Sequence, residues 1–333
     1  MKSSTTTVRR ATSTAHRLGL LLLAAAMAVS LLQAPPADAA FNRPSARLSP
    51  SSGVLFGEYL SPTDNGYRFT RSSQQSRITD QERRLGRKLD LSLYFYGFTS
   101  SFPSWREKWH LDNGRTPVIS WARGDTRQIN NGRYDSMIRA RADGVKALGR
   151  PVFIRWFQEM DGNWTANQAH SPDDFKKAWK RIRSIFRQRG ASNAVWVWCP
   201  NAHNFATGES QRWYPGDDQV DWICADGYNW APGRSRDRWR STAEIFSAAH
   251  AFSVQRRKPM MVGETGVQER RSGEKAEWFR QVAPTLRDRL PNIQAWIYFD
   301  SDKRYDWRSA TSSSSARAFR DLAQHSYMNS RRR

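Results

Sequence analysis

The chain has 333 residues, 38% of them hydrophobic, which is enough for one large domain with a complete core. Its formal net charge is +22, but the basic residues are scattered through predicted helices with acids between them, which favours a solvated surface over a nucleic-acid interface. The two cysteines form no CxxC pair and the six histidines show no HxH or HExxH spacing, so we expect no metal site and no cofactor.

The first 39 residues have the pattern of a secretory signal peptide. A basic start precedes an apolar run over residues 18–32, and Ala37-Asp38-Ala39 supplies small residues at cleavage spacing. We therefore expect a secreted protein, with an uncleaved N-terminal anchor as the alternative, and Arg9-Arg10 leaves Sec and twin-arginine export both open. No other run is long enough to cross a bilayer. Residues 40–53, rich in Ser, Pro and Arg, predict a flexible lead-in, and residues 329–333 form a basic tail.

Short apolar runs alternate with longer amphipathic stretches from residue 54 to residue 328. Several of these runs are apolar on both alternating faces, as expected for strands that are covered on both sides. The expected strands are residues 54–58, 89–96, 117–121, 152–157, 194–199, 222–226, 259–264 and 293–299.

Helix signals lie between the predicted strands. Ser171 is an N-cap before a helix that ends near Gly190, and Ser241 and Glu244 form a capping box before another. Further helices are expected at residues 134–148, 274–290 and 315–327. This alternation predicts a single (β/α)8 TIM barrel over residues 54–328. A doubly wound open sheet is disfavoured because residues 53–57 lack a glycine-rich phosphate turn.

Two glutamates fall at the ends of predicted strands, where barrel enzymes carry their catalytic residues. Glu159 ends the fourth predicted strand and Glu264 ends the seventh, so both reach the C-terminal mouth. Two facing carboxyl groups can cleave a glycosidic bond: a separation of about 5–5.5 Å gives retention and about 6.5–9.5 Å gives inversion. Trp156 and Trp164 flank Glu159 and would raise its pKa, which suits an acid. The alternative is that both glutamates lie in surface loops or form a buried ion pair.

The neighbours of the glutamates suggest supporting roles. Tyr228, at the end of the sixth strand, could hydrogen-bond Glu264, and Arg155 could hold a carboxylate in the same site. Gly263 and Gly266 would let a sugar ring approach. Hexose rings stack on indole, and four of the 15 tryptophans fall at strand ends or in the loops after them, namely Trp121, Trp164, Trp230 and Trp296.

These residues resemble glycoside hydrolase family 26, whose best-known members are secreted endo-β-1,4-mannanases with a (β/α)8 barrel. Residues 159–164 resemble the acid/base motif of that family, Arg155 matches its arginine, and residues 226–230 resemble its strand-six motif, which here contains Asp226, Tyr228 and Trp230. Residues 263–266 resemble the nucleophile segment, and Trp296 is similar in position to the tryptophan that stacks under the sugar. The resemblance covers residues 54–325.

The resemblance implies a retaining glycoside hydrolase with Glu159 as acid/base and Glu264 as nucleophile. Gln158 stands where mannanases of the family usually carry histidine, near the 2-hydroxyl that distinguishes mannose from glucose. An endo-β-1,4-mannanase is therefore the favoured prediction, with a β-glucanase or β-xylanase close behind. A non-catalytic glycan-binding barrel is the alternative from another class. We expect a polysaccharide or oligosaccharide as partner, no nucleic acid and a monomer.

The pairing of the two cysteines is left open by the sequence. Cys199 and Cys224 fall in neighbouring predicted strands of an exported chain, so a disulfide is possible on distance. Two buried free thiols are the alternative.

Overall fold

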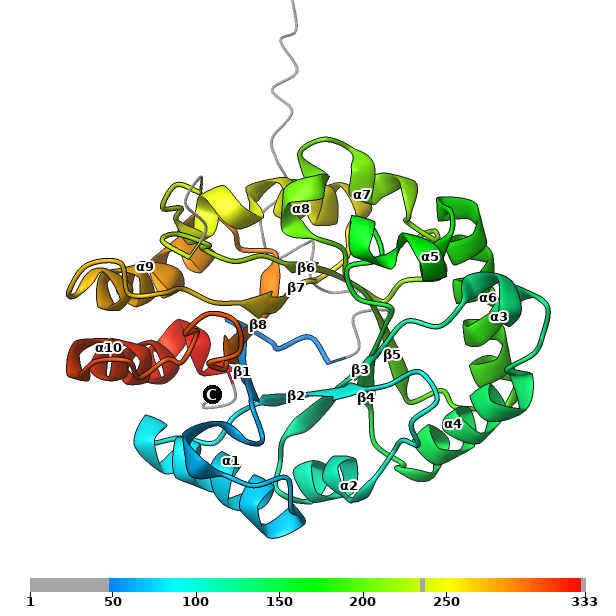
Figure 1. Ribbon diagram of the computed structural model, residues 1–333, viewed down its shortest axis with the longest axis horizontal. Helices are drawn as coiled ribbons and strands as arrows, with labels where there is room; N and C mark the ends of the chain where they lie inside the picture. The colour runs from blue at the N-terminus through cyan, green and yellow to red at the C-terminus, as the bar shows by residue number, and fades with distance from the viewer. Residues whose placement is uncertain (1–47, 234–236, 331–333) are drawn as a thin grey trace, which may run out of the picture. The chain divides into compact units, whose positions relative to one another are not determined.

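A closed barrel of eight parallel strands forms the centre of the residues that the structure describes, 48–233 and 237–330 of a computed structural model (Figure 1). The predicted signal peptide, most of the lead-in and residues 331–333 lie outside that part. The strands pair in sequence order and β8 closes on β1. They are β1 Leu55–Leu60, β2 Leu91–Tyr96, β3 Thr116–Trp121, β4 Val152–Trp156, β5 Ala194–Trp198, β6 Trp222–Asp226, β7 Met260–Thr265 and β8 Ile293–Asp300.

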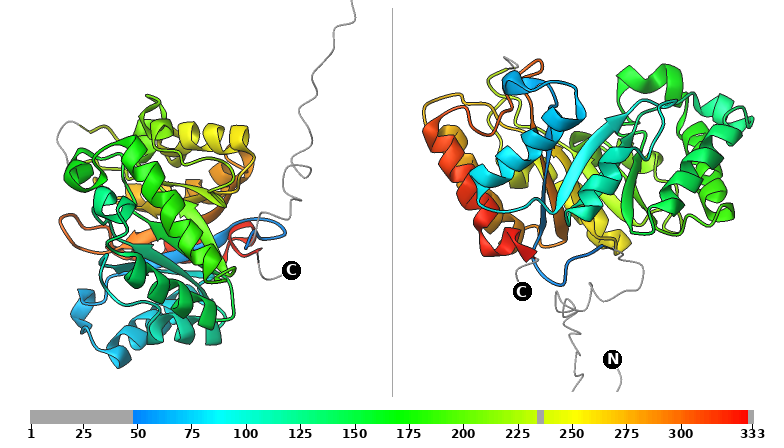
Figure 2. Two further views of the ribbon diagram at one scale, coloured as in Figure 1. Left: turned by 90° about the vertical axis from the view of Figure 1, so that its right-hand side faces the viewer. Right: turned by 90° about the horizontal axis from the view of Figure 1, so that it is seen from below.

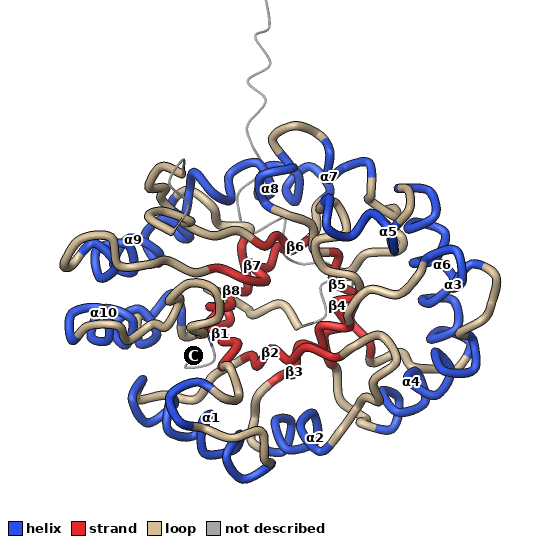
Figure 3. Tube along the Cα trace, viewed as in Figure 1, coloured by secondary structure: helices blue, strands red, loops and turns tan. Residues whose placement is uncertain are grey.

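The helices lie outside the ring of strands, as Figure 3 shows. They are α1 Arg71–Leu85, α2 Trp105–Asp112, α3 Thr126–Asn130, α4 Asp135–Ala147, α5 Ala166–Ala169, α6 Pro172–Gln188, α7 Glu209–Arg212, α8 Thr242–Arg256, α9 Glu274–Asp288 and α10 Ser313–Gln324, with 3-10 turns η2 Asp64–Gly66, η3 Asn163–Thr165, η4 Ala202–Phe205 and η5 Ser326–Met328. The predicted (β/α)8 barrel is confirmed. In the described part of the chain, no helix combines the length and the apolar character needed to cross a bilayer.

The capping signals of the sequence mark real helix starts. The Ser171 side chain accepts from the backbone N–H of Asp174 at the start of α6, and Ser241 and Glu244 cap each other at the start of α8. The strand ends also fall within about two residues of the prediction.

Helix α1 was not predicted, because its buried face is polar. Arg77 pairs with Asp300 at 2.7 Å, Gln81 donates to Glu58 at 3.0 Å, and Glu82 accepts from Arg115. These contacts join α1 to β1, β8 and the start of β3, and α1 lies beside α10 (Figure 2). A hydrophobic repeat therefore cannot reveal this helix, since ion pairs and hydrogen bonds replace apolar packing on it.

Two apolar layers result from the alternation of side chains along the strands. One layer fills the barrel itself and includes Leu93, Val118, Phe153 and Ile297. The other lies between the strands and the helices. Leu48, in the part of the predicted lead-in that the structure describes, packs against the layer inside the barrel.

The cysteines are joined by a disulfide between the end of β5 and β6, Cys199 to Cys224. Both are fully buried in the layer inside the barrel. The structure therefore favours the disulfide over the two thiols that the sequence left as an alternative.

We predict that the purified protein, denatured without reductant, will take up no thiol-alkylating reagent, because both sulfurs are bonded to each other. Intact mass before and after alkylation measures this, and a sample reduced first serves as the positive control with two labels. Two labels in the unreduced sample would show that the thiols are free.

Candidate active site

Arg155 connects four strands at the C-terminal mouth of the barrel. Its Nη1 donates to both oxygens of Asp226 on β6, at 2.8 and 3.0 Å, and its Nη2 donates to Oε1 of Glu264 on β7. The Oγ of Ser120 on β3 accepts from Nε at 3.1 Å and from Nη2 at 2.9 Å. Arg155 and Asp226 are both shielded from solvent, so each charge depends on the other.

The pKa values of this cluster reflect the sharing of one cation by two acids. Burial alone would lower the pKa of Arg155, but Asp226 and Glu264 raise it above its ordinary value. Burial raises the pKa of Asp226 well above its ordinary value, and contact with Arg155 opposes that shift. The guanidinium is thus firmly protonated and serves as the fixed positive charge of the site.

A β-bulge at Gly263 turns Glu264 toward the mouth. Cys224 pairs with Met261, but Asp226 pairs with Glu264, so β7 has one extra residue opposite β6. A Cβ on Gly263 would lie against Cys224 Sγ, 2.7 Å from Asp226 Oδ1 and 2.8 Å from Arg155 Nη1. The expectation that Gly263 makes room for sugar is therefore wrong: it makes room for the disulfide and the ion pair beneath Glu264.

The other oxygen of Glu264 is held by Tyr228, which follows β6. The Tyr228 hydroxyl donates to Glu264 Oε2 at 2.7 Å. Burial and then the nearby Glu264 and Asp226 carboxylates raise the pKa of Tyr228 well above its ordinary value, so it remains a donor. Gly266 does not face sugar either, because a Cβ there would lie 2.9 Å from the Trp307 ring and 3.1 Å from that of Tyr228.

Glu159 lies three residues beyond Trp156, the last paired residue of β4, on a turn with unusual backbone angles. Phe157 and Glu159 have φ values of 54° and 57°, which residues with side chains seldom adopt and which concentrate at functional sites. The turn is fixed by a hydrogen bond from Glu159 N to Cys199 O at 2.8 Å. Burial, with a further contribution from the charge of Glu264, raises the pKa of Glu159 to about 8.

The two glutamates therefore have different environments. Glu159 has no side-chain hydrogen bond among the described residues and favours the protonated form at neutral pH. Glu264 faces a guanidinium and a phenol. Such a pair supplies one proton donor and one nucleophilic carboxylate.

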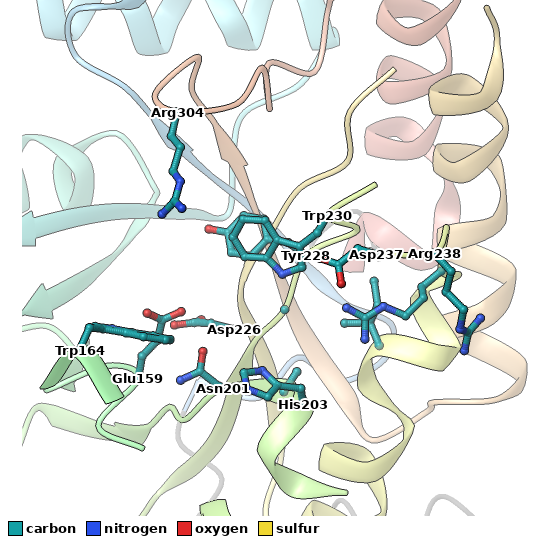
Figure 4. A pocket seen from close by; sticks show the side chains of 14 residues that line it. Glu159, Trp164, Asn201, His203, Asp226, Tyr228, Trp230, Asp237, Arg238 and Arg304 are labelled. Atoms are coloured by element: carbon teal, nitrogen blue, oxygen red, sulfur yellow. The ribbon is translucent and has the colours of Figure 1, made fainter. Parts of the chain in front are cut away.

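A cavity of about 970 Å³ opens over Glu159, Asp226 and Tyr228, and we call it the first cavity (Figure 4). Trp164 lies on its wall and is 51% exposed, and Trp230 packs against Tyr228 on another wall. The remaining lining residues come from the loops after β5, β6 and β8 and from α8, namely Asn201, Ala202, His203, Gly227, Asp237, Arg238, Arg240, Ile245 and Arg304.

Asp161 holds Asn201, which lines the first cavity, and neither residue was predicted from the sequence. Asp161 Oδ1 accepts from the backbone N–H of Asn201 at 3.0 Å and from its Nδ2 at 2.8 Å, while Oδ2 accepts from Ser210 at 2.7 Å. Asp161 lies within the motif that the sequence singled out, but nothing in that motif indicates a partner 40 residues away.

Three aromatic rings occupy the opposite half of the mouth. Phe299 on β8 stacks on Tyr59 of β1 at 4.6 Å between centroids, and Phe95 of β2 packs edge-on against Tyr59 at 5.0 Å. Phe299 also contacts Tyr228, and Phe95 lies beside the Arg155 guanidinium. Tyr59 and Phe95 line a second cavity of about 390 Å³, together with Phe69, Arg106, Lys303 and others.

Two of the predicted substrate-binding tryptophans point away from the mouth. Trp296 is fully buried against Phe56 and Phe319, and Trp121 is fully buried against Phe98 and Phe102. Both belong to the layer between strands and helices, so the prediction that they bind substrate is wrong. Their place on the inward face is taken by Ser120 and by Phe299, which were not predicted.

Gln158 lies beside Glu159 and is half-buried. Its Oε1 is buried and has no hydrogen-bond partner among the residues that the structure describes.

Three residues of types that can bind a metal ion lie close together near Arg155. The ligand atoms of Cys199, Cys224 and Asp226 are within 4.8 Å of one another. Because its two sulfurs are bonded to each other and Asp226 is paired with Arg155, this group does not fit a metal ion.

The sequence model of glycosyl hydrolase family 26 matches residues 105–284, which is more than half of the chain and includes Glu159, Tyr228 and Glu264. The chain belongs to glycosyl hydrolase family 26. The resemblance that the motifs indicated is thereby confirmed.

Individual family-26 relatives carry different names. Endoglucanase H of Acetivibrio thermocellus is 30% identical over 278 residues, which is 80% of this chain and 31% of that protein. A β-1,3-xylanase, TXYA, from a Vibrio species is 25% identical over 214 residues, 56% of this chain and 43% of that protein. The chain thus spans less than half the length of each. A β-mannanase from Bacteroides ovatus shares the fold, with a TM-score of 0.61, 15% identity and coverage of 83% and 90% of the two chains.

We predict that shortening the outward Trp296 will affect stability, whereas shortening the inward Phe299 will affect substrate binding. Trp296→Leu should lower the free energy of unfolding by about 2–4 kcal/mol, because it opens a cavity in a packed layer. Phe299→Ala should instead raise KM by about fivefold, since an aromatic contact with a sugar ring is worth roughly 1 kcal/mol. Denaturant melts and steady-state kinetics on both variants measure this. An increase in KM with Trp296→Leu at unchanged stability would reverse the assignment.

Proposed function

We propose that this protein is a retaining β-glycan hydrolase in which Glu159 is the acid/base and Glu264 the nucleophile. The observation that carries the proposal is the contrast between the two glutamates. Glu159 has a pKa of about 8, whereas Glu264 is held by Arg155 and Tyr228. Hydrolysis with retention needs one carboxyl that carries a proton and one that attacks.

In the first step, an oxygen of Glu264 attacks the anomeric carbon while Glu159 gives its proton to the leaving glycosidic oxygen. The bond between that carbon and the leaving oxygen breaks, and an ester to Glu264 forms. In the second step, the ionised Glu159 takes a proton from water, the water oxygen attacks the same carbon, and Glu264 is released. The charge of Glu264 disappears when the ester forms, which itself lowers the pKa of Glu159 and suits its second role as a base.

Arg155 and Tyr228 act through Glu264. Their two hydrogen bonds leave the carboxylate little freedom to rotate, so its position at the mouth of the barrel is fixed. Asp226 keeps Arg155 in place and limits the charge that Arg155 can direct at Glu264.

Two kinds of polysaccharide main chain are the main candidates for the substrate. The resemblance of the motifs to mannanases supports β-1,4-mannan, while the 30% identity to a protein named endoglucanase supports a β-glucan. Gln158 adds to the second possibility, because it stands where mannanases of the family usually carry histidine. Release of reducing sugars from mannan, barley glucan, xylan and laminarin decides between them.

We further propose a secreted monomer that acts on polymers. The predicted signal peptide supports export, and cavities on both halves of the mouth give room for several sugar units.

We predict that Glu159→Ala and Glu264→Ala will each lose cleavage of the polymer by about 100- to 10,000-fold, with azide rescue giving opposite anomers. In Glu159→Ala, azide replaces the water and gives a β-glycosyl azide. In Glu264→Ala, azide replaces the nucleophile and gives an α-glycosyl azide. NMR of products from an aryl β-glycoside with a good leaving group distinguishes them. Glu277→Gln, on the exposed face of α9, is the control and should keep full activity.

The same anomer from both variants would exclude the assigned roles. A glycan-binding barrel without catalysis would show no cleavage even in the unchanged protein.

We predict that kcat/KM will decline as the pH rises through about 8, because Glu159 must carry a proton to act as the acid. A substrate with a dinitrophenyl leaving group needs no such proton, so this decline should be absent when Glu159→Ala acts on it. Initial rates between pH 5 and pH 10 measure both profiles. A decline that remains in Glu159→Ala would assign the titration to another group.

A further inference from the structure

Three arginines line the first cavity, and two of them have no acidic partner among the described residues. Arg238 pairs with Glu244 of α8 at 2.5 Å. Arg240 and Arg304 form no ion pair within the described part of the chain. The first cavity therefore has two cationic groups, Arg240 and Arg304, available to a ligand.

Arg240 is held in place by its own backbone. Its N–H donates to Oδ1 of the buried Asn229 at 3.3 Å, and its carbonyl oxygen accepts from Trp278 Nε1 at 3.1 Å. Both contacts come from the layer around β6 and α9, so the residue cannot move away from the wall without breaking them. The side chain is half-buried, which makes a charge–charge contact stronger than in open water.

Arg304 approaches from the loop after β8. Its guanidinium lies over the Tyr305 ring at 5.5 Å, and Tyr305 packs against Trp230 and Trp307. Figure 4 shows the Arg304 side chain reaching toward the first cavity from the side opposite Glu159 and Trp164. The preceding residue, Lys303, lines the second cavity, so this loop offers a cation to each half of the mouth.

The acids at the mouth do not cancel these charges. Glu264 and Asp226 share Arg155, which leaves Asp237 as the acid on the arginine side of the first cavity. Asp237 Oδ2 is buried without a hydrogen-bond partner among the described residues.

We propose that the natural substrate is an acidic β-glycan, whose carboxylate or sulfate groups are bound by Arg240 and Arg304 while the backbone is cleaved at Glu159 and Glu264. The proposal rests on the proposed hydrolase function and names its substrate class. Guanidinium groups bind carboxylate and sulfate oxygens through two parallel hydrogen bonds, which gives orientation as well as affinity.

The test compares derivatives of whichever neutral polymer the protein cleaves best. Carboxymethyl and hydroxyethyl derivatives at equal, low substitution have side groups of similar size and differ in charge, and a sulfated derivative separates the two anions. We expect kcat/KM to be at least about tenfold higher on an anionic derivative than on the hydroxyethyl one at low salt, a ratio that falls toward one near 0.5 M salt. A ratio at or below one for both anionic derivatives would overturn the proposal.

Two variants locate the effect. Arg240→Gln and Arg304→Gln should each lower the anionic-to-neutral ratio by about fivefold. Arg320→Gln removes the same charge from the exposed face of α10, away from the lining of both cavities, and should leave the ratio unchanged. An equal decrease in all three variants would indicate overall charge rather than the cavity.

Affinity electrophoresis keeps the test independent of turnover. The unchanged protein should migrate more slowly in gels that contain the carboxymethyl or sulfated derivative than in gels that contain the hydroxyethyl derivative. In the anionic gels, Arg240→Gln should be retarded less than Arg320→Gln. If no polymer is cleaved but this pattern holds, the hydrolase function fails and the anionic site stands. If neutral polymer is cleaved and the pattern is absent, the hydrolase function stands and the acidic substrate fails.

Discussion

The ion pair of Arg155 with Asp226 and Glu264 is the contact on which the rest of the mouth depends. It joins β4, β6 and β7, and Ser120 adds β3. Removing one partner from such a buried group leaves an uncompensated charge, at a cost of about 3–5 kcal/mol. The bulge at Gly263 turns Glu264 toward Arg155, the absence of a side chain at Gly263 leaves room for the disulfide and the ion pair, and Tyr228 holds the other oxygen of Glu264.

The same contact explains why two glutamates on one barrel differ. Arg155 donates hydrogen bonds to Asp226 and Glu264 and makes none to Glu159, so its charge lowers the pKa of Glu159 by less than burial raises it. Glu159 is then left with burial and the repulsion of Glu264, and both raise its pKa. In the proposed mechanism, the acid and the nucleophile are therefore distinguished by which glutamate contacts the Arg155 guanidinium.

The sequence predicted the barrel and its strands well, because strands covered on both faces form apolar runs that little else imitates. It singled out Glu159 and Glu264, the proposed catalytic pair, because charged residues at the ends of such runs are rare. It did not predict on which face of a strand a given side chain lies. Since both faces of β8 are apolar, nothing in the run separates the outward Trp296 from the inward Phe299. It also failed at α1, where polar pairs take the place of an apolar stripe.

The residues that end the strands on the inward face divide the mouth into two halves. On β3, β4, β6 and β7 they are polar or charged: Ser120, Arg155, Asp226 and Glu264. On β8, β1 and β2 they are the aromatic Phe299, Tyr59 and Phe95. A hexose ring has an apolar face and a rim of hydroxyls, so a ring that lies on the aromatic half presents its anomeric carbon and its oxygens to the charged half. The division follows from the order of the strands, and under the proposed mechanism it places the reacting bond beside Glu264, which the buried Arg155 guanidinium holds.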